Sequence, residues 1–307
     1  MNNYKVKIIL CTFNGQEFLE EQLNSLLKQT YDNFSLDIYD DCSNDNTISI
    51  IKTFIKKYPK INARLFFRKK NIGYYKNFMN ALLTKNLNSE LILLCDQDDV
   101  WLPNKIQRVI DKYTNSALPF IYFSTRSIAD KNLRIKKILP KKNYPTSFFH
   151  LFFQNIAGGN TIAINKILLK KLRMFRYLTS FTVHDWQIIS IALTIKDCIL
   201  YFDLTPTILY RQHSAAAIGV DYNFIRKIYL VFSLKYKKDI TMRLNFFILN
   251  YENLSPDQLK FIKKIKYYRN KSFFQRLINI RDISFCKYRY DFSKRILWYF
   301  FILIGLF

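Results

Sequence analysis

The chain of 307 residues is predicted to form an α/β fold with a mostly parallel central sheet, followed by a C-terminal basic α-helical region. Apolar runs of strand length alternate with segments of helical period, which is typical of a parallel sheet with crossover helices. Polar residues gather where those runs end, and basic and aromatic residues become frequent after Gly219. Ligands of such sheets bind beyond the carboxyl ends of the strands, so the polar residues mark the expected site.

The first hundred residues carry the clearest alternation. Strands are expected at residues 5–12, 34–39, 64–67 and 91–95. Apolar residues at helical spacing follow the first three strands, at 18–27, at 48–55 and after Gly73. The fourth strand is almost wholly apolar and is therefore expected at the centre of the sheet, covered on both faces. Pro103 is expected to open a helix just beyond it.

The later segments are less regular. Further strands are expected at residues 119–124 and 161–164, with one or two more at 199–210 around Pro206. A helix is expected at 184–194. Residues 220–307 contain 18 Lys and Arg against six Asp and Glu, and large apolar residues alternate with the cations. We therefore expect two parts, a domain at 1–219 and a basic, aromatic-rich helical region at 220–307.

The composition sets limits on partners and compartment. The net charge of +25 predicts attraction to nucleic acid, an anionic membrane or phosphorylated substrates. The alternative interpretation is an AT-rich genome, which would make Lys, Asn, Ile, Phe and Tyr abundant together. The five cysteines show no metal-ligand or disulfide spacing, and the N-terminus leads directly into a strand. No apolar run reaches the ~20 residues of a membrane-spanning helix. We expect a cytoplasmic protein with reduced cysteines.

The run Asp96-Gln97-Asp98-Asp99 is the strongest chemical signal. Three carboxylates so close together raise one another's pKa unless a cation neutralises them. Oxygen ligands favour a hard ion, so the run predicts a site for Mg²⁺ or Mn²⁺. The alternative is a loop of helix-capping Asp residues before the expected helix.

Three other segments carry weaker signals, each with a structural alternative. Asp40-Asp41 follows the second strand and either binds a base or ribose or forms a turn. Asp185 either acts as a base or only favours the start of a helix. Gly158-Gly159-Asn160 indicates either close approach to a ligand or an ordinary tight turn. His150 lies among aromatic residues and is interpreted as structural.

Several motifs in order resemble the family-2 glycosyltransferases, inverting enzymes with the GT-A fold. The motifs stand at Ile8–Gly15, Asp40–Thr47, Asn71-Ile72-Gly73 with Asn77, Asp96–Trp101, His184-Asp185-Trp186 and Leu209–His213. The last motif is similar to the closing motif of the rhamnosyltransferase-like branch. The resemblance covers roughly residues 5 to 219. Cys11 and Cys42 depart from it, because many members carry a small hydroxyl residue and a glycine there.

The resemblance implies a role for each matching residue. Residues expected at the nucleotide are Thr12, Phe13, Asn14, Asp41, Asn71, Gly73, Asn77 and Asp96. Those expected at the metal and the diphosphate are Asp98, Asp99, His213 and, as a phosphate contact, Arg211. Asp185 is expected to be the catalytic base. Apart from the resemblance, Gly158, Gly159 and Trp186 are expected near the acceptor. Whether Asp98 or Asp99 is the direct metal ligand stays open.

The resulting functional hypothesis is an inverting, metal-dependent glycosyltransferase. It would use dTDP-rhamnose or a UDP-hexose and a glycan acceptor, expected on a polyprenyl diphosphate, in the biosynthesis of lipopolysaccharide or capsule. The basic tail is predicted to dock on the anionic inner face of the cell membrane, and no nucleic acid is expected as a partner. The rival hypotheses are a non-catalytic acidic-pocket module and a nucleic-acid-binding protein driven by the charge.

Overall fold

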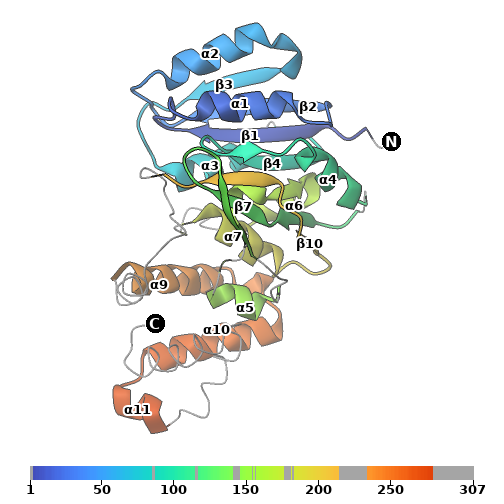
Figure 1. Ribbon diagram of the computed structural model, residues 1–307. Helices are drawn as coiled ribbons and strands as arrows, with labels where there is room; N and C mark the ends of the chain where they lie inside the picture. The colour runs from blue at the N-terminus through green and yellow to red at the C-terminus, as the bar shows by residue number, and fades with distance from the viewer. Residues whose placement is uncertain are drawn as a thin grey trace.

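The computed structural model of the chain describes residues 3–84, 87–114, 117–140, 146–153, 155, 157–175, 181, 183–213 and 234–278. Its central feature is a seven-stranded sheet in the order β10-β6-β9-β4-β1-β2-β3 (Figure 1). The strands are β1 (Val6–Thr12), β2 (Phe34–Asp40), β3 (Ala63–Phe67), β4 (Leu91–Asp96), β6 (Phe120–Ser124), β9 (Ala163–Asn165) and β10 (Ile199–Asp203). All neighbours pair in parallel except those of β9, so the prediction of a mostly parallel sheet is confirmed.

Helices cover both faces of this sheet. They are α1 (Leu19–Leu27), α2 (Thr47–Lys57), α3 (Tyr74–Leu83), α4 (Lys105–Lys112), α5 (Phe148–Phe153), α6 (Lys166–Leu172) and α7 (His184–Ala192), with short 3₁₀ turns η1 (Pro59–Ile61) and η2 (Gly159–Thr161). Successive residues of β4 point to opposite faces: Ile92 and Leu94 enter one core cluster, and Leu91, Leu93 and Cys95 enter the other. Burial on both faces explains why this strand reads as continuously apolar.

The antiparallel strand β9 places a turn beside the end of β4. Ala163 pairs with Leu93 and Asn165 with Leu91, so the start of β9 adjoins the carboxyl end of β4. The strand begins two residues later than predicted because Gly159–Thr161 form η2. As a result, Gly159 and Asn160 arrive beside the acidic run, although the sequence separates them widely.

A second sheet of four short strands lies beside the first, in the order β5-β11-β7-β8. Its strands are β5 (Val100–Trp101), β7 (Arg126–Ala129), β8 (Ile135–Leu139) and β11 (Ile208–Arg211). Leu209 pairs with Val100, which brings the end of β11 next to the acidic run that precedes β5. This pairing brings the last motif of the resemblance, Leu209–His213, next to the motif Asp96–Trp101.

The described part of the tail is helical, as predicted. It contains α9 (Leu234–Leu249), η3 (Tyr251–Asn253), α10 (Pro256–Arg269) and α11 (Phe273–Ile278); residues 220–233 and 279–307 lie outside the described residues. Helices α9 and α10 pack with α5, and the ring centroids of Phe148 and Phe247 lie 5.0 Å apart. The core that includes α7 therefore continues across the predicted boundary at residue 219/220.

Candidate active site

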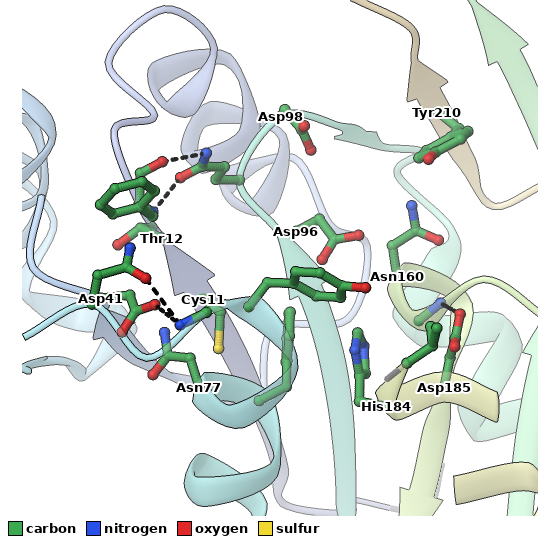
Figure 2. A pocket seen from close by; sticks show the side chains of 18 of the residues that line it. Cys11, Thr12, Asp41, Asn77, Asp96, Asp98, Asn160, His184, Asp185 and Tyr210 are labelled. Atoms are coloured by element: carbon green, nitrogen blue, oxygen red, sulfur yellow. Dashed lines mark hydrogen bonds between the residues drawn. The ribbon is translucent and has the colours of Figure 1, made fainter. Parts of the chain in front are cut away.

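A cavity of about 370 Å³ opens at the carboxyl ends of β1, β2 and β4, the edge predicted from the sequence (Figure 2). Predicted site residues that line it are Thr12, Phe13, Asp41, Asn71, Gly73, Asn77, Asp96, Asp98, Gly159 and Asp185. Six others lie outside its lining: Asn14, Asp99, Gly158, Trp186, Arg211 and His213. The cavity thus collects residues from the beginning, middle and later part of the chain.

At one end of the cavity, the buried Asp41 carboxylate fixes a loop. It accepts hydrogen bonds from the backbone amides of Ile72 and Gly73, at 2.9 and 2.8 Å. Gly73 has φ +85°, a conformation that favours glycine. Asn71 also accepts a bond from the Gly73 amide, at 3.0 Å. Asp41 therefore shapes this end of the cavity through Gly73, and both residues line it.

Asn77 is held at the same end by two hydrogen bonds. Its side-chain nitrogen donates to the Tyr39 carbonyl at 2.7 Å, and its oxygen accepts from Arg68 Nε at 3.0 Å. Cys42, which follows Asp41, has φ +69°, a backbone conformation that favours glycine. The Cys42 side chain is exposed.

The end of β1 is tied to its neighbours by side-chain bonds. Thr12 Oγ1 donates to the buried carboxylate of Asp40 at 2.9 Å. The Phe13 amide donates to Gln97 Oε1 at 2.8 Å, and Gln97 Nε2 donates back to the Phe13 carbonyl at 2.9 Å. The Phe13 ring remains 43% exposed at the cavity and offers an apolar face to a flat ligand. Asn14 instead accepts a bond from the Asn44 amide and braces the loop.

The acidic run divides into two parts with different surroundings. Asp96 and Asp98 line the cavity, whereas Asp99 is fully buried behind it. Burial, together with the charges of Asp98 and then Asp185, raises the pKa of Asp96 to about 7. Both Asp99 oxygens are engaged, one by the Asn160 side-chain amide and the other by the Arg211 backbone amide at 3.2 Å. Burial raises the pKa of Asp99 as well.

The end of β11 is packed tightly onto this run. The Arg211 side chain is buried, and its Nε donates to the Asp98 carbonyl at 2.9 Å. His213 Nε2 lies 2.9 Å from Asp98 Oδ2, and the His213 ring packs on Phe18 with centroids 4.7 Å apart. Among the predicted metal ligands, the structure therefore brings Asp98 and His213 together.

Asp185 lies at the start of α7, on the side of the cavity opposite Asp41 (Figure 2). Its Oδ2 accepts a bond from the Gly159 amide at 3.1 Å, and its Oδ1 accepts one from the Trp186 amide at 2.6 Å. A Cβ at Gly159 would lie 2.3 Å from His184 Nε2, so this close approach requires glycine. The buried His184 ring stacks on Phe78, and burial lowers its pKa.

Trp186 points away from the cavity. Its indole nitrogen donates to the Leu151 carbonyl, and the Arg243 guanidinium of α9 lies 3.7 Å from its ring centroid. Trp186 therefore connects the helix that carries Asp185 to the tail rather than lining the cavity.

Several cavity residues had no individual role predicted from the sequence, although Gln97, Asn160, His184 and Tyr210 lie within its motifs. They are Tyr74, Phe78, Gln97, Arg126, Asn160, Val183, His184 and Tyr210, with Cys11 noted only as a departure from the family pattern. Arg126 and Tyr210 come from the second sheet, which the sequence did not predict. Asn160 stood in a predicted glycine-rich turn, and its position beside Asp96 depends on the antiparallel entry of β9.

Asp98, which lines the cavity, and His213, which lies just outside its lining, form a donor pair that fits a hard divalent cation. Asp98 supplies a carboxylate oxygen and His213 an imidazole nitrogen at one point, with Asp96 on the same loop. No group of three or more His, Cys, Asp or Glu side chains with metal-site geometry occurs within the described ranges. A site of two protein ligands leaves coordination positions for diphosphate oxygens, as Mg²⁺ commonly requires.

The sheet and the cavity define a glycosyltransferase of the GT-A type. Residues 7–173 match the family model described as glycosyl transferase family 2, so the chain belongs to this family and is an enzyme of glycosyl transfer. The resemblance inferred from the motifs is thereby confirmed.

Named relatives and a solved structure agree with this assignment. The dTDP-rhamnosyl transferase RfbG of Shigella flexneri is 32% identical, over 76% of this chain and 82% of the relative. The UDP-Glc:alpha-D-GlcNAc-diphosphoundecaprenol beta-1,3-glucosyltransferase WfgD of Escherichia coli is 28% identical, over 55% of this chain and 63% of the relative. The mannosyltransferase PcManGT from Pyrobaculum calidifontis was solved with GDP-Man and Mn²⁺. Its superposition covers 100% of this chain and 86% of the mannosyltransferase chain, with TM-score 0.52 and 14% identity. At that identity the last likeness shows the fold alone.

Proposed function

We propose that the chain is an inverting, metal-dependent glycosyltransferase that moves a sugar from a nucleoside diphosphate donor to a glycan acceptor in bacterial surface polysaccharide biosynthesis. One observation carries the proposal. Asp96 at the end of β4 and Asp98 just after it share a single cavity with Asp185 at the start of α7 and with Thr12 and Asp41 at the opposite end. Such a cavity can hold a nucleoside at one end and a diphosphate beside the acidic run, with a catalytic base at the other end.

The proposed donor is dTDP-rhamnose, with a UDP-hexose as the alternative. The closing motif Leu209–His213 favours dTDP-rhamnose, and the relative RfbG is named a dTDP-rhamnosyl transferase. The relative WfgD is named for a UDP-glucose donor and supports the alternative. The exposed ring of Phe13 and the loop held by Asp41 would contact the base and the ribose.

The proposed reaction is a single displacement. An acceptor hydroxyl oxygen attacks the anomeric carbon, the bond between that carbon and the diphosphate oxygen breaks, and the nucleoside diphosphate leaves. The hydroxyl proton passes to a carboxylate oxygen of Asp185, which two backbone amides orient. Attack opposite to the leaving group inverts the anomeric configuration, so no enzyme nucleophile is required.

Asp98 and His213 would hold Mg²⁺ or Mn²⁺. When bound, such an ion would neutralise the negative charge that develops on the leaving diphosphate. Asp99 would not contact the ion. It would hold the acidic run in place, because its hydrogen bonds connect the run to η2 and to β11. Asp96 would face the ribose or the sugar.

The proposed acceptor is a glycan on a polyprenyl diphosphate, and the protein would work at the inner face of the cell membrane. The relative WfgD is named for such an acceptor. Within the described ranges, every helix is too short or too polar to cross a membrane. Residues 220–307 would attach peripherally, through cations and apolar side chains of the tail.

Donor turnover with the full chain tests the proposal. The protein is incubated with dTDP-rhamnose or UDP-glucose and Mn²⁺ or Mg²⁺, and release of dTDP or UDP is measured with and without a chelator. We expect metal-stimulated release from one donor. If neither nucleotide is released or bound, and RNA binds with a steep salt dependence instead, the nucleic-acid hypothesis replaces this one.

A further inference from the structure

The cavity contains an excess of negative charge for a site that receives a diphosphate. Four carboxylates line it, those of Asp41, Asp96, Asp98 and Asp185. An anionic ligand therefore needs cationic side chains in addition to a metal ion. The inference below rests on the proposed function and asks which side chain supplies that charge.

Arg211 was the cation predicted from the sequence, but each of its three guanidinium nitrogens already donates a hydrogen bond. Its Nε donates to the Asp98 carbonyl, its Nη1 to the Lys131 carbonyl and its Nη2 to Glu21. Its guanidinium carbon also lies 4.5 Å from the Phe18 ring centroid, and the residue is only 2% exposed. Arg211 would have to abandon these contacts to bind a phosphate.

Lys105 is directed elsewhere too. It is buried, its Nζ donates to the Asn160 carbonyl at 2.9 Å, and it does not line the cavity. Its position behind Asn160 makes it a support for η2 rather than a ligand contact.

Arg126, the first residue of β7, differs from both. Its side chain lines the cavity and is partly exposed, and its guanidinium makes neither a hydrogen bond nor an ion pair with any residue that the structure describes. The guanidinium carbon lies 4.5 Å from the centroid of the Tyr210 ring, which holds it by a cation–π contact. Toward the described part of the chain, all five N–H donors of this group therefore remain available.

Gly158 leaves room for this arginine. A Cβ at Gly158 would lie 2.1 Å from Arg126 Nη1, while its φ of −95° and ψ of 140° suit any residue. Gly158 also precedes Gly159, whose amide holds Asp185. The free cation is thus placed on the side of the cavity where the proposed base lies.

We propose that Arg126 binds a diphosphate oxyanion in this cavity. The planar guanidinium can donate two parallel hydrogen bonds to phosphate oxygens while its face stays on Tyr210. The diphosphate can come from the nucleotide donor or from the acceptor, and the two sources differ in the experiment that detects them.

The experiment is calorimetric titration of the full chain with UDP and dTDP in Mn²⁺, comparing wild type, Arg126→Ala, Arg126→Lys and Gly158→Ala. Arg134→Ala is the matched control, because Arg134 is exposed, lies outside the cavity and removes the same charge. A donor contact predicts that Arg126→Ala raises the nucleotide Kd by about tenfold or more, the usual effect of losing a charge-assisted hydrogen bond. Arg126→Lys should recover part of the loss, and Gly158→Ala should reproduce it by displacing the guanidinium.

An acceptor contact predicts a different pattern. The nucleotide Kd stays unchanged in Arg126→Ala, and protein saturated with nucleotide and Mn²⁺ binds farnesyl diphosphate, but not farnesol, only when Arg126 is present. If Arg126→Ala matches the control in both titrations, the inference is overturned and the proposed function stands. If the wild type binds no nucleotide diphosphate, both are overturned.

Discussion

His213 Nε2 lies 2.9 Å from Asp98 Oδ2, although 115 positions separate the two residues in the sequence. The contact exists because β11 pairs with β5 immediately after the acidic run. It places an imidazole nitrogen beside the Asp98 carboxylate, whereas both oxygens of Asp99 are occupied by hydrogen bonds to Asn160 and Arg211. The choice between these two carboxylates, which the sequence left open, is therefore proposed to fall on Asp98.

Asp99→Ala should destabilise the fold. The change leaves the Asn160 side-chain amide and the Arg211 backbone amide without their acceptor, and burial keeps water from replacing it. We expect the free energy of unfolding to fall by about 1–3 kcal/mol for each amide left unpaired. Urea unfolding measures this, with Asp98→Ala as the control at the cavity surface. Equal stability of Asp99→Ala and wild type would contradict the supporting role.

Asp185→Asn should abolish proton transfer, with the loss of one of the two backbone hydrogen bonds that the carboxylate accepts. The asparagine has nearly the same shape but cannot take the acceptor proton, so kcat should fall by roughly 10²- to 10⁴-fold. The Kd for the donor should change little. The control is Asp197→Asn, an exposed turn residue with φ +59°, which asparagine tolerates. Turnover at the wild-type rate would remove Asp185 from the mechanism.

Lys105 should make stability depend on pH. Burial lowers its pKa to about 7, against the opposing influence of Cys95, Asp99 and Asp96. Between pH 7 and about 10 the unfolded chain holds a proton on this amine that the folded chain lacks, so the free energy of unfolding rises with pH in that window. For Lys105→Met, the free energy of unfolding should rise less steeply between pH 7 and 9 than it does for the wild type. Parallel curves for the two proteins in urea unfolding would show that Lys105 does not titrate there.

The tail should bind anionic membranes through α11. Phe274 and Ile278 of this short helix are 72% and 81% exposed, and α11 lies at the end of the molecule opposite β3 (Figure 1). We expect the full chain to float with vesicles rich in phosphatidylglycerol at low salt, and Phe274→Glu to reduce the floated fraction. Phe67→Glu changes an exposed phenylalanine of β3 and serves as control. A wild-type chain that stays with the soluble fraction would contradict membrane docking.

The sequence predicted the first half of the fold well because burial there follows a simple pattern. Strands β1 and β4 are covered on both faces and read as apolar runs, and α1 places Leu19, Leu23 and Leu26 at helical spacing on its buried face. The second sheet escaped prediction because its strands are short and pair over long distances in the chain. The four residues of β7 carry no periodicity that would mark them.

Prediction of the site was limited for a related reason. Motif spacing located Asp96 to Asp99 but could not tell which carboxylates of an irregular loop face the cavity. Arg211 matched a motif, yet its partners Glu21 and Lys131 come from distant segments that only the fold brings near. Arg126 belongs to no motif, and its exposure to the cavity follows from the pairing of β7 with β11.

The most direct test of the central claim is calorimetric titration of the full chain with UDP and dTDP, with and without Mn²⁺, in wild type, Asp98→Ala and His213→Ala. We predict that Mn²⁺ strengthens nucleotide binding by the wild type about tenfold or more, and that Asp98→Ala loses this gain while His213→Ala loses most of it. The control His150→Ala, in α5 and outside the cavity, should behave as the wild type. Nucleotide affinity that does not respond to Mn²⁺, or that responds equally in Asp98→Ala, would contradict the claim that this acidic run holds a metal against the diphosphate.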